Sequence, residues 1–200
     1  MVTKSVLSSE ININCSTERV WNIISSPNNL NHSHPFCKAN IIQKWGKEGA
    51  KDTIKYYNNL VLNRYFIKWR EGKGYELIIV KGNQNLGKVI WEILELEKDV
   101  SRLKISLNIY PEITLKKYPS YIIPLIKQTY FLPNMNKYLL SVVKGFKYYI
   151  KGEDLDIKVN ICLIRKMKFE YGLDLPELIF DEEGNPNLSD FKITLNKIIE

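Results

Sequence analysis

The chain has 200 residues and a net charge of +7, with 44% hydrophobic and 26% charged residues, which is the composition of an ordinary globular protein. No apolar run approaches the roughly 20 residues of a membrane-spanning helix, and the first residues lack the apolar core of a signal peptide. We therefore expect a cytoplasmic protein without a membrane span.

The charge is unevenly distributed along the chain. Residues 153–200 carry eleven acidic and six basic side chains, whereas residues 1–152 carry eleven acidic and 23 basic ones. This asymmetry indicates two segments with different roles. We expect one domain at 1–152 and an acidic C-terminal extension at 153–200, whose secondary structure the pattern leaves undecided.

The first predicted elements are a strand and two short helices. Residues 4–14 alternate between apolar and polar side chains, as a half-buried strand does. Ser16 or Thr17 is a typical helix N-cap. Pro27 ends that helix and begins a second one, which runs through Leu30 to about Ser33.

From Cys37 onward the apolar period changes from helical to alternating, which predicts six strands. Their expected ranges are 38–45, 51–58, 60–70, 74–81, 87–97 and 101–110. Short turns separate them, so successive strands should pair as antiparallel neighbours. In the last of these strands, four apolar residues alternate with polar ones and should point inward: Leu103, Ile105, Leu107 and Ile109.

A long amphipathic helix is predicted after the sheet. Residues 119–132 are apolar but interrupted by Pro124, so they should be helical and kinked. Residues 134–152 then place apolar side chains on one helical face and lysines on the other. The apolar face comprises Met135, Leu139, Val142, Val143, Phe146, Tyr149 and Ile150.

Several local strings resemble the START-like or SRPBCC superfamily of polyketide cyclases, birch-pollen-allergen-like proteins and lipid-transfer domains. They are STERVWNIISSP at 16–27, HPF at 34–36, GAKDTI at 49–54, GYEL at 74–77 and YLLSVVKGFKYYI at 138–150. The resemblance covers residues 4–152. It implies an α+β helix-grip fold, in which a curved antiparallel sheet of about seven strands surrounds a long C-terminal helix and leaves a cavity between them.

The resemblance implies a function only in outline, because the superfamily hosts several activities. The preferred hypothesis is the binding of a hydrophobic small molecule or lipid between the sheet and the long helix. The alternatives are a polyketide cyclase- or dehydratase-like enzyme in the same cavity, and a protein-interaction or chaperone-assisting module with a protein partner. No cofactor is expected, and no catalytic residue is transferred from the family.

Strand parity selects the residues expected to face the cavity. The same residues would also suit an ordinary aromatic core. The candidate ligand-binding residues on strands are Tyr56, Asn63, Tyr65, Trp69, Tyr75 and Trp91, and those on the long helix are Leu139, Val143 and Phe146.

Four side chains are candidates for acid–base catalysis: His34, Asp52, Tyr56 and Tyr65. Arg64 alternates with Tyr65, which favours a surface position for the arginine. His32 and His34 are the only histidines, and no acidic or cysteine cluster completes a metal set around them. Cys15, Cys37 and Cys162 are widely spaced and should be reduced thiols.

The lysine face of the long helix would suit nucleic acid or anionic lipid, and it or the C-terminal extension would serve the interaction-module alternative. Such lysines are usually solvated, and no nucleic-acid-binding motif accompanies them, so no nucleic acid is expected. The motifs GxGxxG, GxSxG and HExxH and the phosphate-binding P-loop are absent from the sequence. Nucleotide-dependent chemistry and serine hydrolysis are therefore poorly supported.

Overall fold

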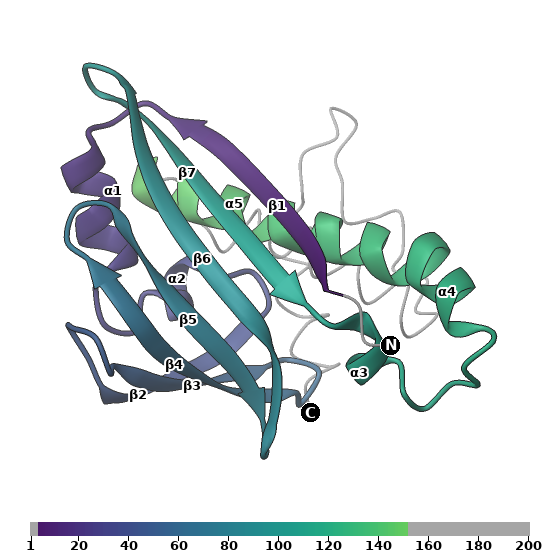
Figure 1. The fold of residues 1–200 in the computed structure, drawn as a ribbon. Helices are drawn as coiled ribbons and strands as arrows, with labels where there is room; N and C mark the ends of the chain where they lie inside the picture. The colour runs from purple at the N-terminus through teal and green to yellow at the C-terminus, as the bar shows by residue number, and fades with distance from the viewer. Residues whose placement is uncertain (1–3, 152–200) are drawn as a thin grey trace, which may run out of the picture. The chain divides into compact units, whose positions relative to one another are not determined.

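The computed structural model describes residues 4–151, which form one seven-stranded sheet and the helices that pack on it (Figure 1). All strands are antiparallel, in the order β1-β7-β6-β5-β4-β3-β2. The predicted antiparallel sheet of about seven strands is confirmed. Their bounds are β1 (Ser5–Ile13), β2 (Cys37–Lys44), β3 (Lys51–Tyr56), β4 (Val61–Arg70), β5 (Gly74–Lys81), β6 (Gln84–Glu97) and β7 (Val100–Ile109).

The largest difference from the predicted strand ranges is at the start of β6. The glycine-rich stretch from Gly82 to Gly87 was expected to be a loop, yet β6 begins at Gln84 and pairs directly with Lys81. Gly82 has a φ of +56°, which a glycine adopts without steric cost. It therefore allows a two-residue turn, and the strand starts earlier than its composition indicates.

Two short helices connect β1 to β2. Helix α1 (Thr17–Ile24) begins at the predicted cap, where the Ser16 hydroxyl accepts a hydrogen bond from the Arg19 backbone N–H. Helix α2 (Leu30–Ser33) lies where the second short helix was expected. Residues Val20, Trp21, Ile24 and Leu30 from the two helices are buried, so both contribute to the core.

The segment after β7 is more helical than predicted. Helix α3 (Pro111–Thr114) follows the sheet directly, and α4 (Ile123–Ile126) contains Pro124 in its first turn. A π-helical turn, η1 (Lys127–Phe131), then leads into α5 (Leu132–Lys151). The long helix thus starts one residue before Pro133, and this proline leaves the helix with one backbone N–H fewer. The wider π-helical turn lies directly before this start.

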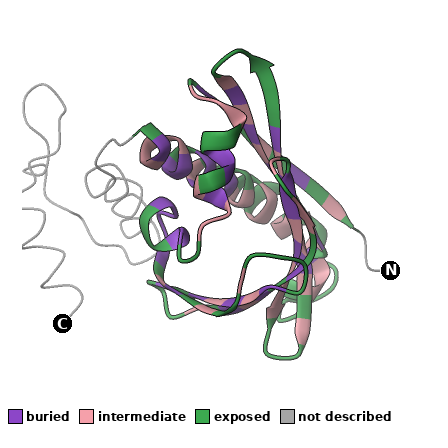
Figure 2. Cartoon of the chain, turned by 90° about the vertical axis from the view of Figure 1, so that its left-hand side faces the viewer, coloured by how far each residue is buried: buried purple, intermediate pink, exposed green. Residues whose placement is uncertain are grey.

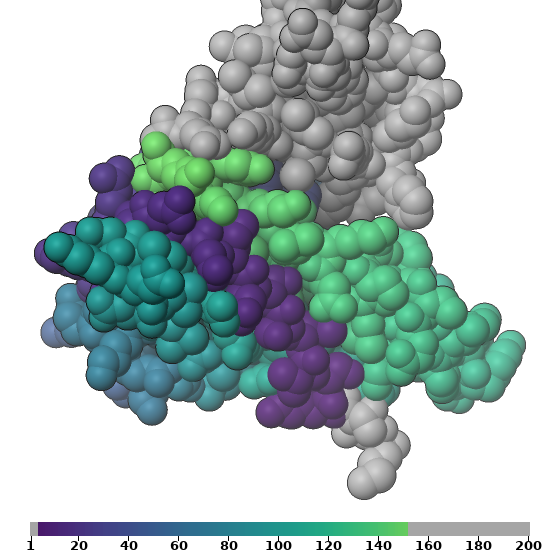
Figure 3. All heavy atoms as spheres, turned by 90° about the horizontal axis from the view of Figure 1, so that it is seen from above, coloured from purple at the N-terminus to yellow at the C-terminus, as the bar shows by residue number. Residues whose placement is uncertain are grey.

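The sheet curves around α5 (Figure 2), and five of the seven residues of its predicted apolar face are buried, whereas Met135 and Tyr149 are half-buried. Leu139, Val143 and Phe146 are almost inaccessible to solvent, whereas Lys144 on the opposite side is exposed. The ring of Phe146 meets that of Trp91 on β6 at 4.8 Å between centroids. Strand β1 also lies alongside α5, as Figure 3 shows from above. The inward residues predicted for β7 are all buried as well.

Gly145 permits the closest approach between α5 and the segment after α2. A Cβ at this position would lie 2.2 Å from the backbone oxygen of Ser33 and 3.0 Å from Pro35. No other residue type therefore fits without moving the backbone. This contact holds the His34–Pro35 segment against the inner side of α5.

The acidic extension predicted at 153–200 lies outside the described residues, as do Cys162 and the boundary of the extension. The acidic extension, its boundary and the reduced state of Cys162 therefore remain predictions. Within residues 4–151, no helix combines the length and the apolar character needed to cross a bilayer.

Candidate functional site

The inner face of β3 brings a carboxylate and a phenol into the interior. Asp52, Ile54 and Tyr56 alternate with exposed or half-buried residues and are each no more than 7% exposed. This is the parity predicted from the sequence. Polar side chains on the inner faces of the neighbouring strands can therefore contact Asp52 and Tyr56.

On β4 the predicted parity was wrong. Arg64 is 4% exposed and points inward, whereas Tyr65 is 37% exposed and lies on the outer face beneath the Lys51 ammonium. Asn63 is also on the outer face, where its side chain accepts a hydrogen bond from Thr53. The reason is the register between β3 and β4, which places Asp52 directly opposite Arg64, and opposite residues share a face.

A bulge on β4 returns Trp69 to the interior. The pairing with β5 shifts between Phe66 and Lys68, which changes the face of the residues that follow. Trp69 then stacks on Tyr75 of β5 with 5.5 Å between ring centroids. The prediction that Trp69 faces inward is therefore correct. The alternation on which it was based, however, holds only for the residues after the bulge.

The aromatic candidates form a packed cluster on the inner face. Tyr75 contacts Phe66 at 5.0 Å and Trp91 at 5.8 Å, and Trp91 continues the contacts to Phe146 on α5. Ring-to-ring packing of this kind is typical of a core. These side chains therefore form one apolar wall, and the polar groups at its border are the ones that suggest a function.

At that border, Asp52 and Arg64 form a buried ion pair. The Arg64 Nε–H donates to Asp52 Oδ1 at 2.8 Å, and Nη2 donates to Oδ2. The Asn40 side chain on β2 donates to the same Oδ2 at 2.9 Å. Burial disfavours the charged guanidinium, but attraction and hydrogen bonding from Asp52 offset this and raise the Arg64 pKa. Asp52 is committed to these partners and is a poor candidate for a free general base.

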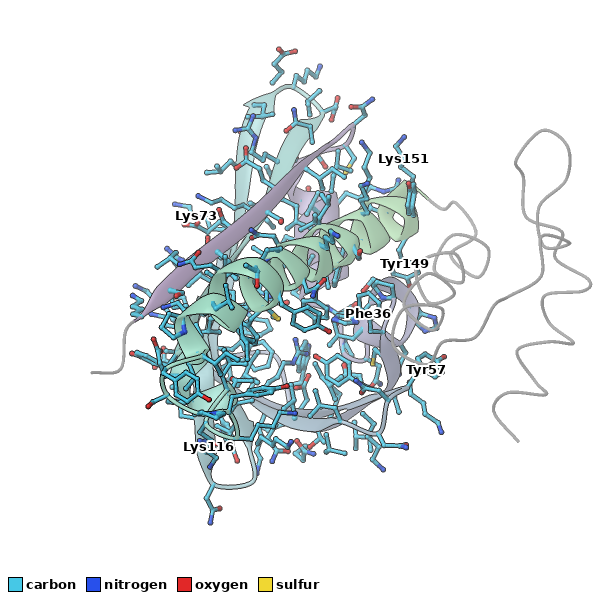
Figure 4. All side chains as sticks on the ribbon, turned by 90° about the vertical axis from the view of Figure 1, so that its right-hand side faces the viewer. Phe36, Tyr57, Lys73, Lys116, Tyr149 and Lys151 are labelled. Atoms are coloured by element: carbon cyan, nitrogen blue, oxygen red, sulfur yellow. The ribbon has the colours of Figure 1, made fainter. Side chains whose placement is uncertain are left out.

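A second group of polar side chains links α5 to the segment after α2. The Tyr138 hydroxyl lies 3.0 Å from Nε2 of His34 and 3.0 Å from the Tyr56 hydroxyl. The backbone N–H of Phe36 donates to Nδ1 of the same histidine at 3.2 Å. Figure 4 shows Phe36 among the side chains that fill the space between α5 and the sheet.

Tyr138 and Asn40 were not predicted as site residues. Tyr138 precedes Val142 by one helical turn, so its spacing from the apolar stripe places it at the stripe's edge. That signal was available in the sequence. Asn40 carries no such signal, because its role depends on the pairing of β2 with β3. We call the residues around the ion pair the polar cluster: His34, Asn40, Asp52, Tyr56, Arg64, Tyr75 and Tyr138.

Some buried polar atoms near this cluster have no hydrogen-bond partner among the described residues. They include the Tyr75 hydroxyl and the side-chain oxygens of Asn29 and Asn40. Burial raises the pKa of Tyr75, and the nearby Arg64 and Asn29 side chains lower it in part. Burial also raises the pKa values of Tyr56 and Tyr138. The phenols are therefore protonated at neutral pH.

The two histidines lie apart in their contacts. His32 stacks on Tyr149 with 5.6 Å between ring centroids, whereas His34 belongs to the polar cluster. In the part of the chain that the structure describes, no three His, Cys, Asp or Glu side chains are grouped as metal ligands.

No protein-family model matches the chain, and no curated protein matches it in sequence. Several solved structures share the fold. The aromatase/cyclase Zhui from Streptomyces sp. R1128 aligns over 74% of this chain and 94% of its own, with a TM-score of 0.59 and 6% identity. The Aha1 dimer protein of Colwellia psychrerythraea aligns over 73% and 96%, with a TM-score of 0.54 and 11% identity.

Truncated norcoclaurine synthase from Thalictrum flavum aligns over 74% of this chain and 94% of its own, with a TM-score of 0.50 and 14% identity. At these identities the likeness establishes the fold alone. The chain has the helix-grip α+β fold that the resemblance implied.

Proposed function

From the helix-grip fold, we propose that the chain binds a hydrophobic small molecule between the sheet and α5. The apolar wall formed by Trp69, Tyr75, Trp91 and Phe146 supports an apolar ligand. Small-molecule sites typically combine such walls with a few polar groups that orient the ligand. The polar cluster at the border of the wall supplies groups of this kind.

The observation that carries this proposal is the set of buried polar atoms without partners. In a core that is only structural, nearly all buried polar atoms are hydrogen-bonded, because each unpaired one costs free energy. Here the Tyr75 hydroxyl is 0% exposed and the Asn40 side chain 4%, and an atom of each is unpaired among the described residues. A ligand with polar groups of its own would satisfy them.

Native mass spectrometry of the full chain, purified without denaturation, tests this proposal. It should show a bound small molecule or, after stripping, a 1:1 complex with added 2-ethylnaphthalene. Tryptophan fluorescence titrations should then compare Val143→Phe, which adds a ring to the buried face of α5, with Lys144→Phe, which adds it to the exposed face. Only Val143→Phe should weaken binding. A chain that binds neither a copurified molecule nor the probe would overturn the proposal.

A second function, acid–base chemistry on the bound molecule, has one specific observation in its favour. The contacts of His34, Tyr138 and Tyr56 connect a histidine to a buried phenol through hydrogen bonds of 3.0 Å. Such a chain suits a proton donor. Of the other catalytic candidates, Asp52 is held by Arg64 and Tyr65 lies on the outer face. In a dehydratase-like reaction, Tyr56 would protonate the departing hydroxyl, which leaves as water, and the Tyr56 phenolate would accept the proton from the neighbouring α-carbon, so that the enone forms and the phenol is restored.

Dehydration of 4-hydroxy-4-phenylbutan-2-one to its conjugated enone, followed by ultraviolet absorbance, tests this second function. Tyr56→Phe should abolish any acceleration by the protein, and Tyr65→Phe, the matched change on the outer face, should retain it. Equal rates with and without the protein would reject catalysis on this model compound, and equal rates for the two variants would reject the role of Tyr56.

A further inference from the structure

The hydrogen-bond directions in the polar cluster follow from the contact at His34. A backbone N–H can only donate, so the Phe36 N–H at 3.2 Å requires a lone pair on Nδ1. In the neutral ring the proton is then on Nε2. This nitrogen therefore donates to the Tyr138 oxygen at 3.0 Å.

One phenolic O–H of the Tyr56–Tyr138 pair is left without an acceptor. Nε2–H and the two phenols bring three protons to only two hydrogen bonds, His34–Tyr138 and Tyr138–Tyr56. Whichever way the phenol pair is oriented, one O–H is uncommitted among the described residues. The Tyr75 O–H is a further donor without an acceptor, since the Arg64 and Asn29 side chains beside it act as donors towards its oxygen. Arg64 connects these phenols: its guanidinium lies 5.2 Å from the Phe66 ring centroid, Phe66 packs on Tyr75 at 5.0 Å, and Arg64 pairs with Asp52 on the same face of β3 as Tyr56. Its charge acts on all three phenols.

The charge balance of the cluster disfavours an anionic ligand. Arg64 and Asp52 are the only buried Arg, Lys, Asp or Glu side chains among residues 4–151, and they neutralise each other. A ligand carboxylate would add a second buried anion close to Asp52 without a second cation. Burying an uncompensated charge is costly. An uncharged oxygen acceptor has no such cost.

We infer that the site recognises an uncharged carbonyl oxygen, such as that of an aryl ketone, through the Tyr75 hydroxyl and the uncommitted O–H of the Tyr56–Tyr138 pair. This inference rests on the proposed ligand-binding function and deepens it. A carbonyl oxygen has two lone pairs, and it therefore accepts from both phenols at once. Fatty acids and other carboxylates are excluded as preferred ligands.

Three probes of similar size and different polar groups test the inference on the full chain: 2-acetylnaphthalene, 2-ethylnaphthalene and 2-naphthoate. We expect the ketone to bind roughly tenfold more tightly than the hydrocarbon, the effect of one or two hydrogen bonds, and the carboxylate to bind most weakly. Tyr75→Phe should bring the ketone-to-hydrocarbon affinity ratio close to one, and Tyr56→Phe should reduce it. Tyr65→Phe should leave the ratio unchanged.

The outcomes separate this inference from the proposed function. Equal binding of ketone and hydrocarbon by the unmodified chain, or tightest binding of 2-naphthoate, would overturn the inference and leave ligand binding intact. An unchanged ratio in Tyr75→Phe would also overturn it. Binding of none of the probes would contradict the proposed function itself. Tyr75→Phe keeps the buried ring and removes only a hydroxyl whose O–H has no acceptor, so it should fold, and thermal unfolding of the variant checks this.

Discussion

At the scale of single residues, the Asp52–Arg64 pair determines the character of the interior. Both side chains are at most 4% exposed, and the guanidinium also lies over the Phe66 ring at 5.2 Å. A buried pair of this kind adds little net stability compared with apolar residues, but losing one partner strands the other charge. The two positions are therefore strongly coupled.

Asp52→Asn should destabilise the protein by about 3–5 kcal/mol, because it leaves the Arg64 charge buried and uncompensated. Adding Arg64→Met should recover most of this loss, since the double variant buries no charge. Urea unfolding of both single variants and the double variant measures the coupling. If the double variant loses as much free energy of unfolding as the two single variants together, Asp52 and Arg64 are not energetically coupled.

Cys37 offers a prediction on pH. Burial raises the pKa of its thiol from 9.0 to about 11, so at pH 9 only about 1% of the folded chain carries the thiolate. In the unfolded chain, the Cys37 thiol ionises near pH 9. The stabilisation from the neutral thiol is therefore complete below pH 9 and is lost as the pH rises towards 11.

Alkylation with iodoacetamide, followed by peptide mass spectrometry, tests this assignment. Cys37 should stay largely unmodified at pH 8 under conditions in which the same thiol reacts fully after denaturation. Its labelling in the folded chain should increase as the pH approaches 11. Rapid labelling of native Cys37 at pH 8 would show that the thiol is neither buried nor raised in pKa.

At the scale of elements, α5 is constrained on one side by the sheet and on another by the segment after α2. The buried stripe was evident from its spacing, because residues three and four apart share a helical face. The contact at Gly145 was not evident from the sequence, because a glycine near the centre of a helix can have several structural roles. Its reason becomes visible only when Ser33 is found beside it.

Gly145→Ala should destabilise the protein, although alanine favours helices by about 1 kcal/mol over glycine. The added methyl group would lie 2.2 Å from the Ser33 backbone oxygen, and one of the two backbones must move. Thermal unfolding compared with Ser141→Ala, a half-buried position on the same helix whose hydroxyl donates to the Lys137 carbonyl, separates the clash from helix propensity. A more stable Gly145→Ala would show that the two segments separate readily.

Phe146→Ala should destabilise the protein by about 3–5 kcal/mol through lost burial and the cavity that remains. Phe146 is 0% exposed and packs against Trp91. Lys144→Ala, on the exposed face, should change stability by no more than about 0.5 kcal/mol. Urea unfolding of the two variants measures the difference. Equal effects would mean that α5 does not present this face to the sheet.

The sequence predicted less of the site than of the elements. Asp52 and Tyr56 were correctly expected to share the inner face of β3, but Arg64 was expected outside and Tyr65 inside. The prediction chose the inner face of β4 by its aromatic residues, while the register with β3 decides it. Aligning 51–56 with 61–65 across their turn would have shown that Asp52 and Asn63 cannot share a face.

At the scale of the whole molecule, the element order was predictable because turn residues separate short, strongly alternating strands. Residues Met1–Glu153 form one compact unit. We expect a chain ending at Glu153 to unfold cooperatively, with a midpoint within about 3 °C of the full-length value, the equivalent of about 1 kcal/mol for a domain of this size. Calorimetry of both chains measures this. A truncated chain without a cooperative transition would refute the predicted domain at 1–152.

The pairing of β1 with β7 also has a consequence for the order of folding. Ser5 lies opposite Ile109, whereas every other pair of neighbouring strands is consecutive in the chain. During synthesis, β1 emerges first yet finds its partner strand last, and it packs on α5 later still. Contacts between distant residues carry a loop-closure cost and slow folding. The strands from β2 to β7 can therefore assemble by local hairpins, and the closure by β1 completes the sheet.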